Sequence, residues 1–132
     1  MSSAISSMTM SEPRAAVVAG HGRFAEGIIS AVAQVMGEGH GLVAVTNTDR
    51  TPEGIDEAMR EALDRTGATV LFTDLPAGSC TFVGARLART RPGLRVITGA
   101  SLPMLLSFVA GGTPEKVMEQ AQAGIRLLGA QG

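Results

Sequence analysis

The sequence predicts an α/β fold: an open, mainly parallel sheet of four strands in the order 2-1-3-4, with helices on both faces. Apolar runs of strand length alternate four times with segments of helical periodicity, which is typical of a parallel sheet covered on both sides. Right-handed crossover connections leave few topologies for this alternation. The 132 residues, 45% hydrophobic and 3% aromatic, suffice for one core filled by aliphatic side chains and methionines.

Boundary signals place the elements in order. The four predicted strands are residues 15–20, 41–46, 68–73 and 94–98. The predicted helices are residues 25–36, 51–67, a segment from 79 to a break at 91–93, residues 104–109 and a last helix from 113. Gly37 suits the C′ position of the first helix. Thr51-Pro52-Glu53 and Thr113-Pro114-Glu115 each supply an N-cap, a proline at N1 and an acid in the first turn.

Residue spacing predicts which faces of two helices turn inward. Ser79 is the expected N-cap of the third helix, which should direct Phe82, Ala85 and Ala88 toward the sheet. The inward stripe expected for the last helix consists of Val117, Ala121, Ile125 and Leu128.

Composition and charge exclude several classes of function. The formal net charge is −1 and no basic block occurs, so nothing points to nucleic acid binding. Cys80 is the lone cysteine, which excludes an internal disulfide and suits a reducing cytosol. No apolar run approaches the ~20 residues that a membrane span needs. Residues 1–12 are small and polar and indicate a disordered leader rather than a signal peptide, which predicts a cytoplasmic protein.

His21 is the most informative residue of the chain. It lies between Gly20 and Gly22, at the C-terminal end of the first predicted strand and at the start of a helix. Ligands of open α/β sheets bind at this edge, and a helix N-terminus favours anions such as phosphate. The order 2-1-3-4 makes the ends of strands 1 and 3 neighbours. Asp74 is therefore expected beside His21, although 53 positions separate the two residues.

This pair suits nucleophilic chemistry by an imidazole. An unperturbed imidazole has a pKa of ~6.5, and one ring nitrogen attacks an electrophile only when the other carries the proton. A carboxylate that accepts that N–H fixes the tautomer and stabilises the growing positive charge. Gly22 lets a phosphoryl group come close, and Ser79 with the backbone around Gly78 could bind its oxygens. No carboxylate cluster for Mg²⁺ and no GxxxxGK[ST] loop occurs, so we expect no metal and no cofactor.

Each of these residues also has a structural interpretation. A histidine between two glycines can be a turn residue, Asp74 a turn former and Ser79 a helix cap. His40, the second histidine, is expected to be a solvated loop residue, and Cys80 a small and inert helix residue. The functional hypothesis therefore depends on the residues taken together.

The assembled motifs resemble enzyme IIA of the mannose-type phosphoenolpyruvate:sugar phosphotransferase system, over about residues 14–128. Gly20–Gly27 matches the family's strand end, Gly-His-Gly, a short gap and Ala-Glu-Gly. Asp74–Cys80 is similar to Asp, two variable residues and Gly-Gly-Ser-Pro, with alanine in place of the first glycine and cysteine in place of the proline. Gly99–Leu105 resembles the run Gly-Ala/Val-Asn/Ser-Leu/Ile-Pro-Met-Leu.

The resemblance implies a phosphotransferase that works through a covalent phosphohistidine. His21 would accept a phosphoryl group from the carrier protein HPr and pass it to an enzyme IIB partner, which phosphorylates a sugar at a membrane permease. Asp74 would bond the ring nitrogen that is not phosphorylated, and Gly22, Gly78 and Ser79 would bind phosphate. The protein would be cytoplasmic, or peripheral at the inner face of the membrane through the permease complex.

The same resemblance implies a domain organisation and an oligomeric state for the chain. Residues 13–132 would form a single IIA-type domain, with the IIB acceptor on a separate polypeptide. Family members are commonly homodimers, some of which exchange a C-terminal strand, so residues 125–129 could form a fifth edge strand instead of a helix end. Ala77 and Cys80 depart from the family pattern in the phosphate loop, which leaves a purely regulatory phosphocarrier as an alternative.

The same residues allow three further functional hypotheses. The phosphocarrier of a dihydroxyacetone kinase system would share the chemistry and differ in partner. A nucleotide-binding module fits Gly20–Ala25, which has the form G-x-G-x-x-A, but Asn47 stands near where an acid would bond a ribose and no second mononucleotide half occurs. A histidine phosphatase is disfavoured, because Gly20 stands where its Arg-His-Gly signature needs arginine.

Overall fold

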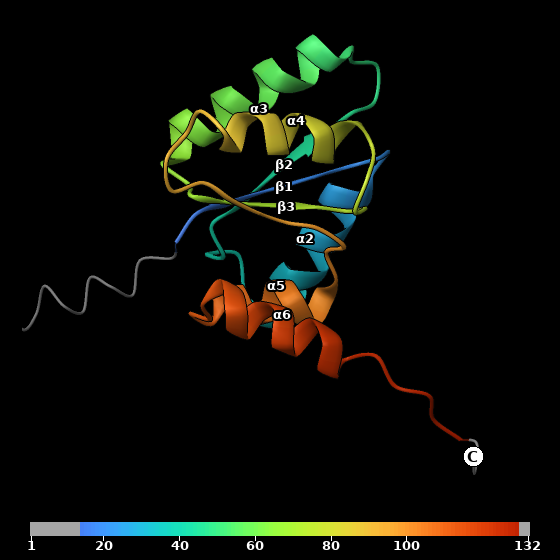
Figure 1. Ribbon diagram of the computed structural model, residues 1–132. Coiled ribbons are helices and arrows are strands. Elements are labelled where there is room, and N and C mark those ends of the chain that lie inside the picture. The colour runs from blue at the N-terminus through green and yellow to red at the C-terminus, as the bar shows by residue number, and fades with distance from the viewer. Residues whose placement is uncertain (1–13, 130–132) are drawn as a thin grey trace, which may run out of the picture.

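The computed structural model describes residues 14–129, in which four strands and five helices alternate (Figure 1). The strands are β1 (Ala16–Gly20), β2 (Leu42–Thr46), β3 (Val70–Thr73) and β4 (Arg95–Ile97). The helices are α2 (Phe24–Met36), α3 (Pro52–Thr66), α4 (Ser79–Ala88), α5 (Leu102–Val109) and α6 (Pro114–Ala123). The predicted alternation of strands and helices is confirmed. The predicted leader, residues 1–12, lies outside the described residues.

The strands form one parallel sheet in the order β2-β1-β3-β4, which confirms the predicted topology. The central strand β1 is buried along its whole length and pairs with β2 up to Gly20 and Thr46. On its other side it pairs with β3 up to Ala19 and Thr73. Because the strands are parallel, the chain leaves β1 and β3 at the same edge of the sheet, side by side.

Helices cover both faces of the sheet. In Figure 1, α3 and α4 lie above the sheet and α2, α5 and α6 lie below it. Neighbouring residues of β1 point to opposite faces, so Val17 belongs to the core under α3 and α4 and Val18 to the core under α2 and α5. The second core includes an edge-to-face pair of Phe72 and Phe108, with ring centroids 5.4 Å apart. The two cores fix β1 and β3, and with them the edge at which both strands end.

The buried face of α4 differs from the prediction. Phe82 is 74% exposed, Ala85 is exposed and Ala88 is half-buried. The residues that face the sheet are Cys80, Val83, Gly84 and Leu87. A Cβ on Gly84 would lie 2.6 Å from Cδ2 of Leu71, so this face requires a glycine where the helix approaches β3. A search for apolar side chains does not select such a face.

The last helix is shorter than predicted. α6 ends at Ala123 and is followed by Gly124, a residue with low helix propensity. Ile125 and Leu128, the last two positions of the predicted stripe, lie beyond the helix and are 83% and 81% exposed. Residues 125–129 form neither a helix nor a strand in the structure, so the helix end expected here was wrong. The strand exchanged with a second protomer stays a prediction.

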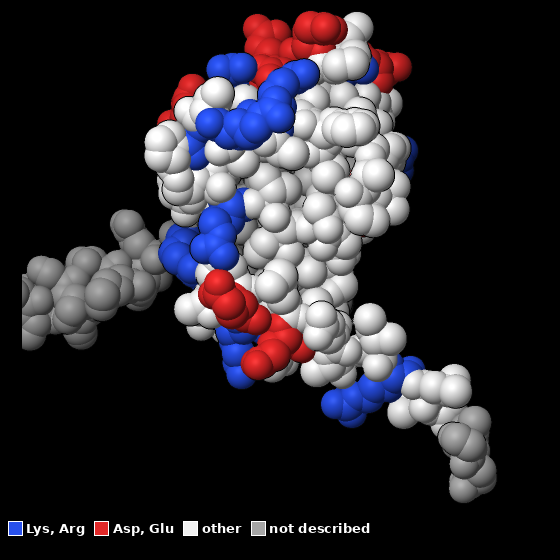
Figure 2. Space-filling view, viewed as in Figure 1, with Lys and Arg blue, Asp and Glu red and all other residues white. Residues whose placement is uncertain are grey.

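Charged side chains gather on part of the surface. Figure 2 shows one group over the helices at the top of the view, where α3 and α4 lie, and a second group at the lower left, while the middle of this face is largely uncharged. On those helices Asp56 pairs with Arg60 and with Arg86, at 2.7 and 3.4 Å. None of the described helices combines the length and the apolar character needed to cross a membrane.

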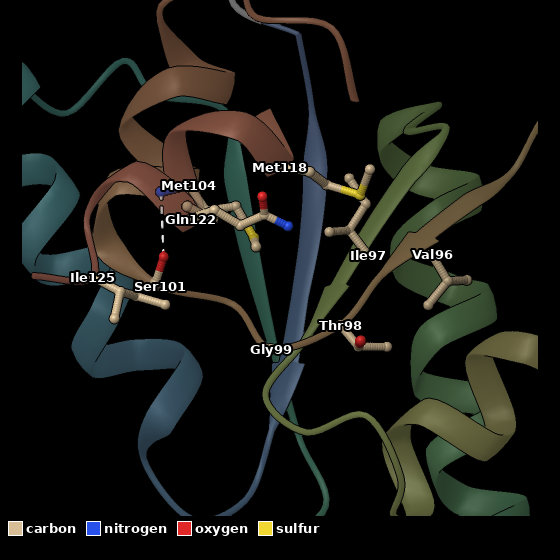
Figure 3. Close-up of a pocket in the computed structure, with 10 residues that line it drawn as sticks. Val96, Ile97, Thr98, Gly99, Ser101, Met104, Met118, Gln122 and Ile125 are labelled. Carbon is tan, nitrogen blue, oxygen red and sulfur yellow. Dashed lines mark hydrogen bonds between the residues drawn. The ribbon is translucent and has the colours of Figure 1, made fainter. Parts of the chain in front are cut away.

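A cavity of about 400 Å³ lies between the edge strand β4 and helices α5 and α6 (Figure 3). Its lining is mainly apolar, from Val96, Ile97, Met104 and Met118, and Ile125 reaches it from the segment after α6. None of the predicted site residues lines it. The predicted chemistry therefore belongs elsewhere, at the ends of β1 and β3.

Candidate functional site

The site forms where the chain leaves β1 and β3. His21 follows β1 and Asp74 follows β3, and Nδ1 of the imidazole lies 2.8 Å from Oδ2 of the carboxylate. The same Oδ2 accepts a hydrogen bond of 2.9 Å from the backbone N–H of His21. The proximity predicted from the strand order is therefore confirmed. A single carboxylate oxygen holds both the ring and the backbone of the histidine.

The two side chains differ sharply in exposure. The His21 side chain is 49% exposed, whereas that of Asp74 is 11% exposed. Burial alone would raise the pKa of Asp74, but the hydrogen bonds from His21 and the charge of its ring bring the pKa below its ordinary value of 3.8. Asp74 is therefore ionised at neutral pH, next to an imidazole that another molecule can reach.

The ionised carboxylate sets the protonation of the ring. A carboxylate only accepts hydrogen bonds, so a neutral imidazole bonded to it carries its proton on Nδ1. This tautomer leaves the lone pair of Nε2 free. When Nε2 attacks an electrophile, the positive charge that grows on the ring is stabilised by the carboxylate. The geometry is that of a nucleophilic Nε2.

Gly20 makes the close approach of the carboxylate possible. A Cβ at this position would lie 2.9 Å from Oδ2 of Asp74 and 2.8 Å from Cδ2 of Phe24. Any side chain would therefore displace both the carboxylate and the phenyl ring. On the other side of His21, Gly22 has a φ of +54° and its carbonyl accepts a 2.8 Å hydrogen bond from Oγ1 of Thr46. The histidine thus lies between two glycines: Gly20 leaves room for the carboxylate, and Gly22 adopts a positive φ that favours glycine.

The ring also faces the N-terminus of α4. Gly78 is the N-cap of this helix, with a φ of +121° that favours glycine. A Cβ on it would lie 3.5 Å from Cε1 and 4.0 Å from Nε2 of His21. Ser79 is the first helical residue, so its predicted N-cap role was wrong. The first N–H groups of α4 have no intrahelical acceptor, which makes this end suitable for an anion.

Polar residues that the sequence analysis did not select hold the loop between β3 and α4. The hydroxyls of Thr73 and Thr81 lie 2.7 Å apart, and Thr81 also donates to the carbonyl of Leu75 at 2.6 Å. Thr73 is the one polar residue that is fully buried among the described residues. These bonds shape the turn that carries Asp74. Nothing in the local sequence marks them, because threonine is ordinary at a strand end and in a first helical turn.

The remaining candidates have structural roles. Cys80 is buried, and burial with the nearby charge of Asp74 raises the pKa of its thiol to about 11, which confirms an inert cysteine. His40 is half-buried and its Nδ1 accepts a 2.9 Å hydrogen bond from the backbone N–H of Leu42. It stabilises the turn into β2 and is not the solvated residue that was expected. No group of three His, Cys, Asp or Glu in residues 14–129 could hold a metal ion.

Comparison with known protein families identifies the family to which the chain belongs. The model of a family described as the PTS system fructose IIA component, EIIA-man, matches residues 15–123. The chain belongs to the mannose-type enzyme IIA family of the phosphotransferase system. It is therefore a phosphocarrier component of that system by family. The match includes both strand ends of the site and all five described helices.

Solved structures of several proteins have the same fold at low sequence identity. A PTS IIA protein associated with the fucose utilization operon of Streptococcus pneumoniae has a TM-score of 0.79 at 19% identity, covering 88% of this chain and 93% of its own. The mannose/sorbose specific IIA subunit of Enterococcus faecalis has a TM-score of 0.77 at 19% identity, covering 89% and 96%. The EIIA component of Streptococcus agalactiae has the same score and identity, covering 86% and 95%. No curated protein sequence matches the chain significantly.

Proposed function

We propose that His21 is the phosphoryl carrier of this chain, that it is charged by the phosphohistidine of HPr, and that it delivers the phosphoryl group to an enzyme IIB partner. The observation that carries the proposal is that the two ring nitrogens of His21 have different surroundings. Nδ1 is occupied by Asp74 at 2.8 Å, while the side chain is 49% exposed and its Nε2 has no hydrogen-bond partner among residues 14–129. Family membership identifies the chain as a phosphotransfer component and supports the donor and acceptor.

The transfer step needs only the two imidazoles. The lone pair of Nε2 of His21 attacks the phosphorus, the N–P bond of the donor breaks, and the electron pair of that bond returns to the donor ring. A donor ring that is protonated on its other nitrogen leaves as neutral imidazole. His21 becomes a phosphorylated imidazolium whose Nδ1–H remains bonded to Asp74, so the carboxylate offsets the new charge. In the second transfer, a nucleophile of the acceptor attacks the phosphorus on His21, the N–P bond to Nε2 breaks, and its electron pair returns to the His21 ring.

The phosphoryl group would be bound at the start of α4. Gly78 borders the ring edge that contains Nε2, and the backbone N–H groups after it, together with the hydroxyl of Ser79, are donors suited to phosphate oxygens. The space beside Gly22 is open to an incoming group, since a Cβ placed there would meet no atom within 4 Å. Such donors stabilise a transferred charge without any metal ion.

A protein donor must cover the region around the exposed ring. Leu75, next to Asp74, is 49% exposed, and Phe82, one helical turn after Gly78, is 74% exposed. Exposed apolar side chains close to a reactive group are suited to a protein partner. We place HPr and enzyme IIB on this rim in turn, in the cytoplasm at the inner face of the membrane that holds the sugar permease.

We also propose that the chain forms a homodimer, as family members commonly do. Ile125, Leu127 and Leu128 are all more than 80% exposed, and the open edge of β4 and its cavity lie next to this segment (Figure 3). Apolar side chains exposed together in one short segment favour association. Sedimentation equilibrium of the wild type and of Leu127→Asp tests this. A dimer that the substitution dissociates is expected, and a monomeric wild type would contradict it.

Phosphorylation of single-residue variants tests the carrier role. The chain is incubated with phosphoenolpyruvate, enzyme I and HPr, and its mass is followed. The wild type should gain one phosphoryl group, and His21→Ala should gain none. His40→Ala is the matched control, because it removes the other histidine and should be phosphorylated as the wild type is. Acid-labile phosphate on His21→Ala would contradict the proposal. Transfer to a IIB protein, as opposed to a kinase component, then distinguishes sugar uptake from a regulatory role.

A further inference from the structure

Asn47 lies at the third strand end of this edge, outside every motif that marks the site. It directly follows β2, its backbone N–H donates to the carbonyl of Gly20 at 3.1 Å, and its own carbonyl accepts from the N–H of Arg50 at 3.2 Å. The first of these bonds ties Asn47 to the residue before His21. Its backbone is therefore fixed with respect to the imidazole.

The side chain of Asn47 connects this strand end to α4. Its Nδ2 donates to Oγ of Ser79 at 3.3 Å, across 32 positions of sequence. Both residues are half-buried, which excludes much of the competing water. Ser79 follows Gly78, the residue that borders Cε1 and Nε2 of His21. The amide thus reaches the one hydroxyl at the proposed phosphate loop.

The hydroxyl of Ser79 has a single hydrogen, and the hydrogen bond that it accepts from Asn47 influences the direction in which that hydrogen points. Because Oγ of Ser79 accepts from the amide, its own hydrogen is not used in that contact and is available to another acceptor. We propose that Asn47 is a positioning residue that turns the O–H of Ser79 toward the phosphoryl group carried on Nε2 of His21. This inference rests on the proposed function and adds a residue to it.

The chemistry of the site favours this division of roles. A phosphoryl group brings negative oxygens, and a hydrogen bond from a neutral hydroxyl to a charged acceptor is stronger than one between neutral groups. A free hydroxyl samples several rotations, whereas one that accepts from a fixed amide is directed before the anion arrives. Asn47 acts through Ser79 and does not itself need to touch the phosphoryl group.

A double-mutant cycle tests the inference on the full chain. Asn47→Ala, Ser79→Ala and the double variant are phosphorylated by HPr, and both the transfer rate and the hydrolytic lifetime of the phosphohistidine are measured. Ser79→Ala should slow transfer by roughly 10-fold, the loss of one hydrogen bond to a charged group. Asn47→Ala should slow it by a smaller factor, and the double variant should equal Ser79→Ala. Effects that multiply would overturn the inference, as would an Asn47→Ala variant with wild-type transfer.

Asn47→Asp tests the direction of the hydrogen bond to Ser79 while keeping the size of the side chain at position 47. A carboxylate of the same size accepts the Ser79 hydrogen instead of donating to its oxygen, and it places negative charge near the phosphoryl group. We expect this variant to be slower than Asn47→Ala and its phosphohistidine to have a shorter lifetime. Wild-type behaviour of Asn47→Asp would refute the role of the amide as a donor.

Two measurements separate this inference from site collapse and from the proposed function. The NMR signal of the Nδ1 proton of His21 should be unchanged in Asn47→Ala, because Asp74 still accepts it, whereas a disordered site would lose it. Thr48→Ala alters the neighbouring exposed residue, whose hydroxyl is hydrogen-bonded to that of Thr46, and should transfer phosphate normally. If the wild type itself is not phosphorylated on His21, the proposed function fails. If it is, and Asn47→Ala behaves normally, only this inference fails.

Discussion

Substitution of Gly20 by alanine should damage both the stability and the chemistry of the chain. A Cβ at this position would lie 2.9 Å from Oδ2 and 3.0 Å from Cγ of Asp74, and 2.8 Å from Cδ2 of Phe24. Ordinary contact begins near 3.4 Å, so these atoms must withdraw by about 0.5 Å. Oδ2 is the atom that accepts both hydrogen bonds from His21. The methyl group therefore competes with the contact that orients the imidazole.

The expected loss follows from this geometry. Overpacking of one methyl group in a rigid site costs about 1–3 kcal/mol in the free energy of unfolding. Displacement of the carboxylate removes the contact that fixes the tautomer of His21, and phosphoryl transfer should slow by roughly 10²-fold. Urea unfolding measures the first effect, and the rate of phosphorylation by HPr measures the second. The NMR signal of the Nδ1 proton of His21 reports whether the ring has lost its partner.

Gly27→Ala is a matched control on the same strand–helix unit. Gly27 lies inside α2, and a Cβ there would meet no atom within 4 Å. Alanine is favoured over glycine in a helix interior, so this variant should gain about 0.5–1 kcal/mol and keep normal transfer. The reasoning is refuted if Gly20→Ala unfolds at the same urea concentration as the wild type and transfers phosphate at the same rate.

Four further predictions concern Asp74, the pH dependence of stability, Cys80 and Gly84. Asp74→Asn should slow transfer by roughly 10²-fold, since an amide cannot offset the imidazolium charge; normal transfer would remove Asp74 from the mechanism. Because folding lowers the pKa of Asp74, its ionisation contributes stability that is fully present above pH 3.8 and is lost as the pH falls through the folded pKa. The difference in urea stability between wild type and Asp74→Asn should therefore shrink below pH 3.8, and a constant difference down to acid pH would count against it. Cys80, with a thiol pKa near 11, should resist iodoacetamide in the native chain at pH 7 and react only on unfolding; rapid native alkylation would show that the thiol is accessible. Gly84→Ala should cost about 1–3 kcal/mol, because its Cβ would lie 2.6 Å from Cδ2 of Leu71, and unchanged urea unfolding would show that β3 yields without cost.

The sequence predicted the fold because the physics of each element is local. Apolar runs and helix-start signals such as Thr51-Pro52 determine strands and helices within a few residues, and right-handed crossovers then restrict the strand order. The order alone was enough to bring His21 and Asp74 together, now 2.8 Å apart. That prediction succeeded because both residues directly follow strands, where the backbone leaves little freedom.

The failures concern features that depend on contacts between distant segments. Phe82 was expected inside, but the helix turns Gly84 to the sheet because only glycine fits against Leu71. Ser79 was expected to cap α4, but Gly78 does so with a positive φ. The hydrogen bond that reaches Ser79 from Asn47 spans 32 positions and has no local signature. Residue spacing does not predict such long-range contacts, whereas the structure shows them.

The central claim is that Nε2 of His21 carries the phosphoryl group while Nδ1 stays bonded to Asp74. The most direct test is NMR of the chain labelled with ¹⁵N in its histidines and phosphorylated by HPr, in which the coupling between ³¹P and ¹⁵N identifies the phosphorylated nitrogen. The expected result is a single phosphohistidine, at Nε2 of His21, with the proton retained on Nδ1. Coupling to Nδ1 of His21, or to either nitrogen of His40, would contradict the claim.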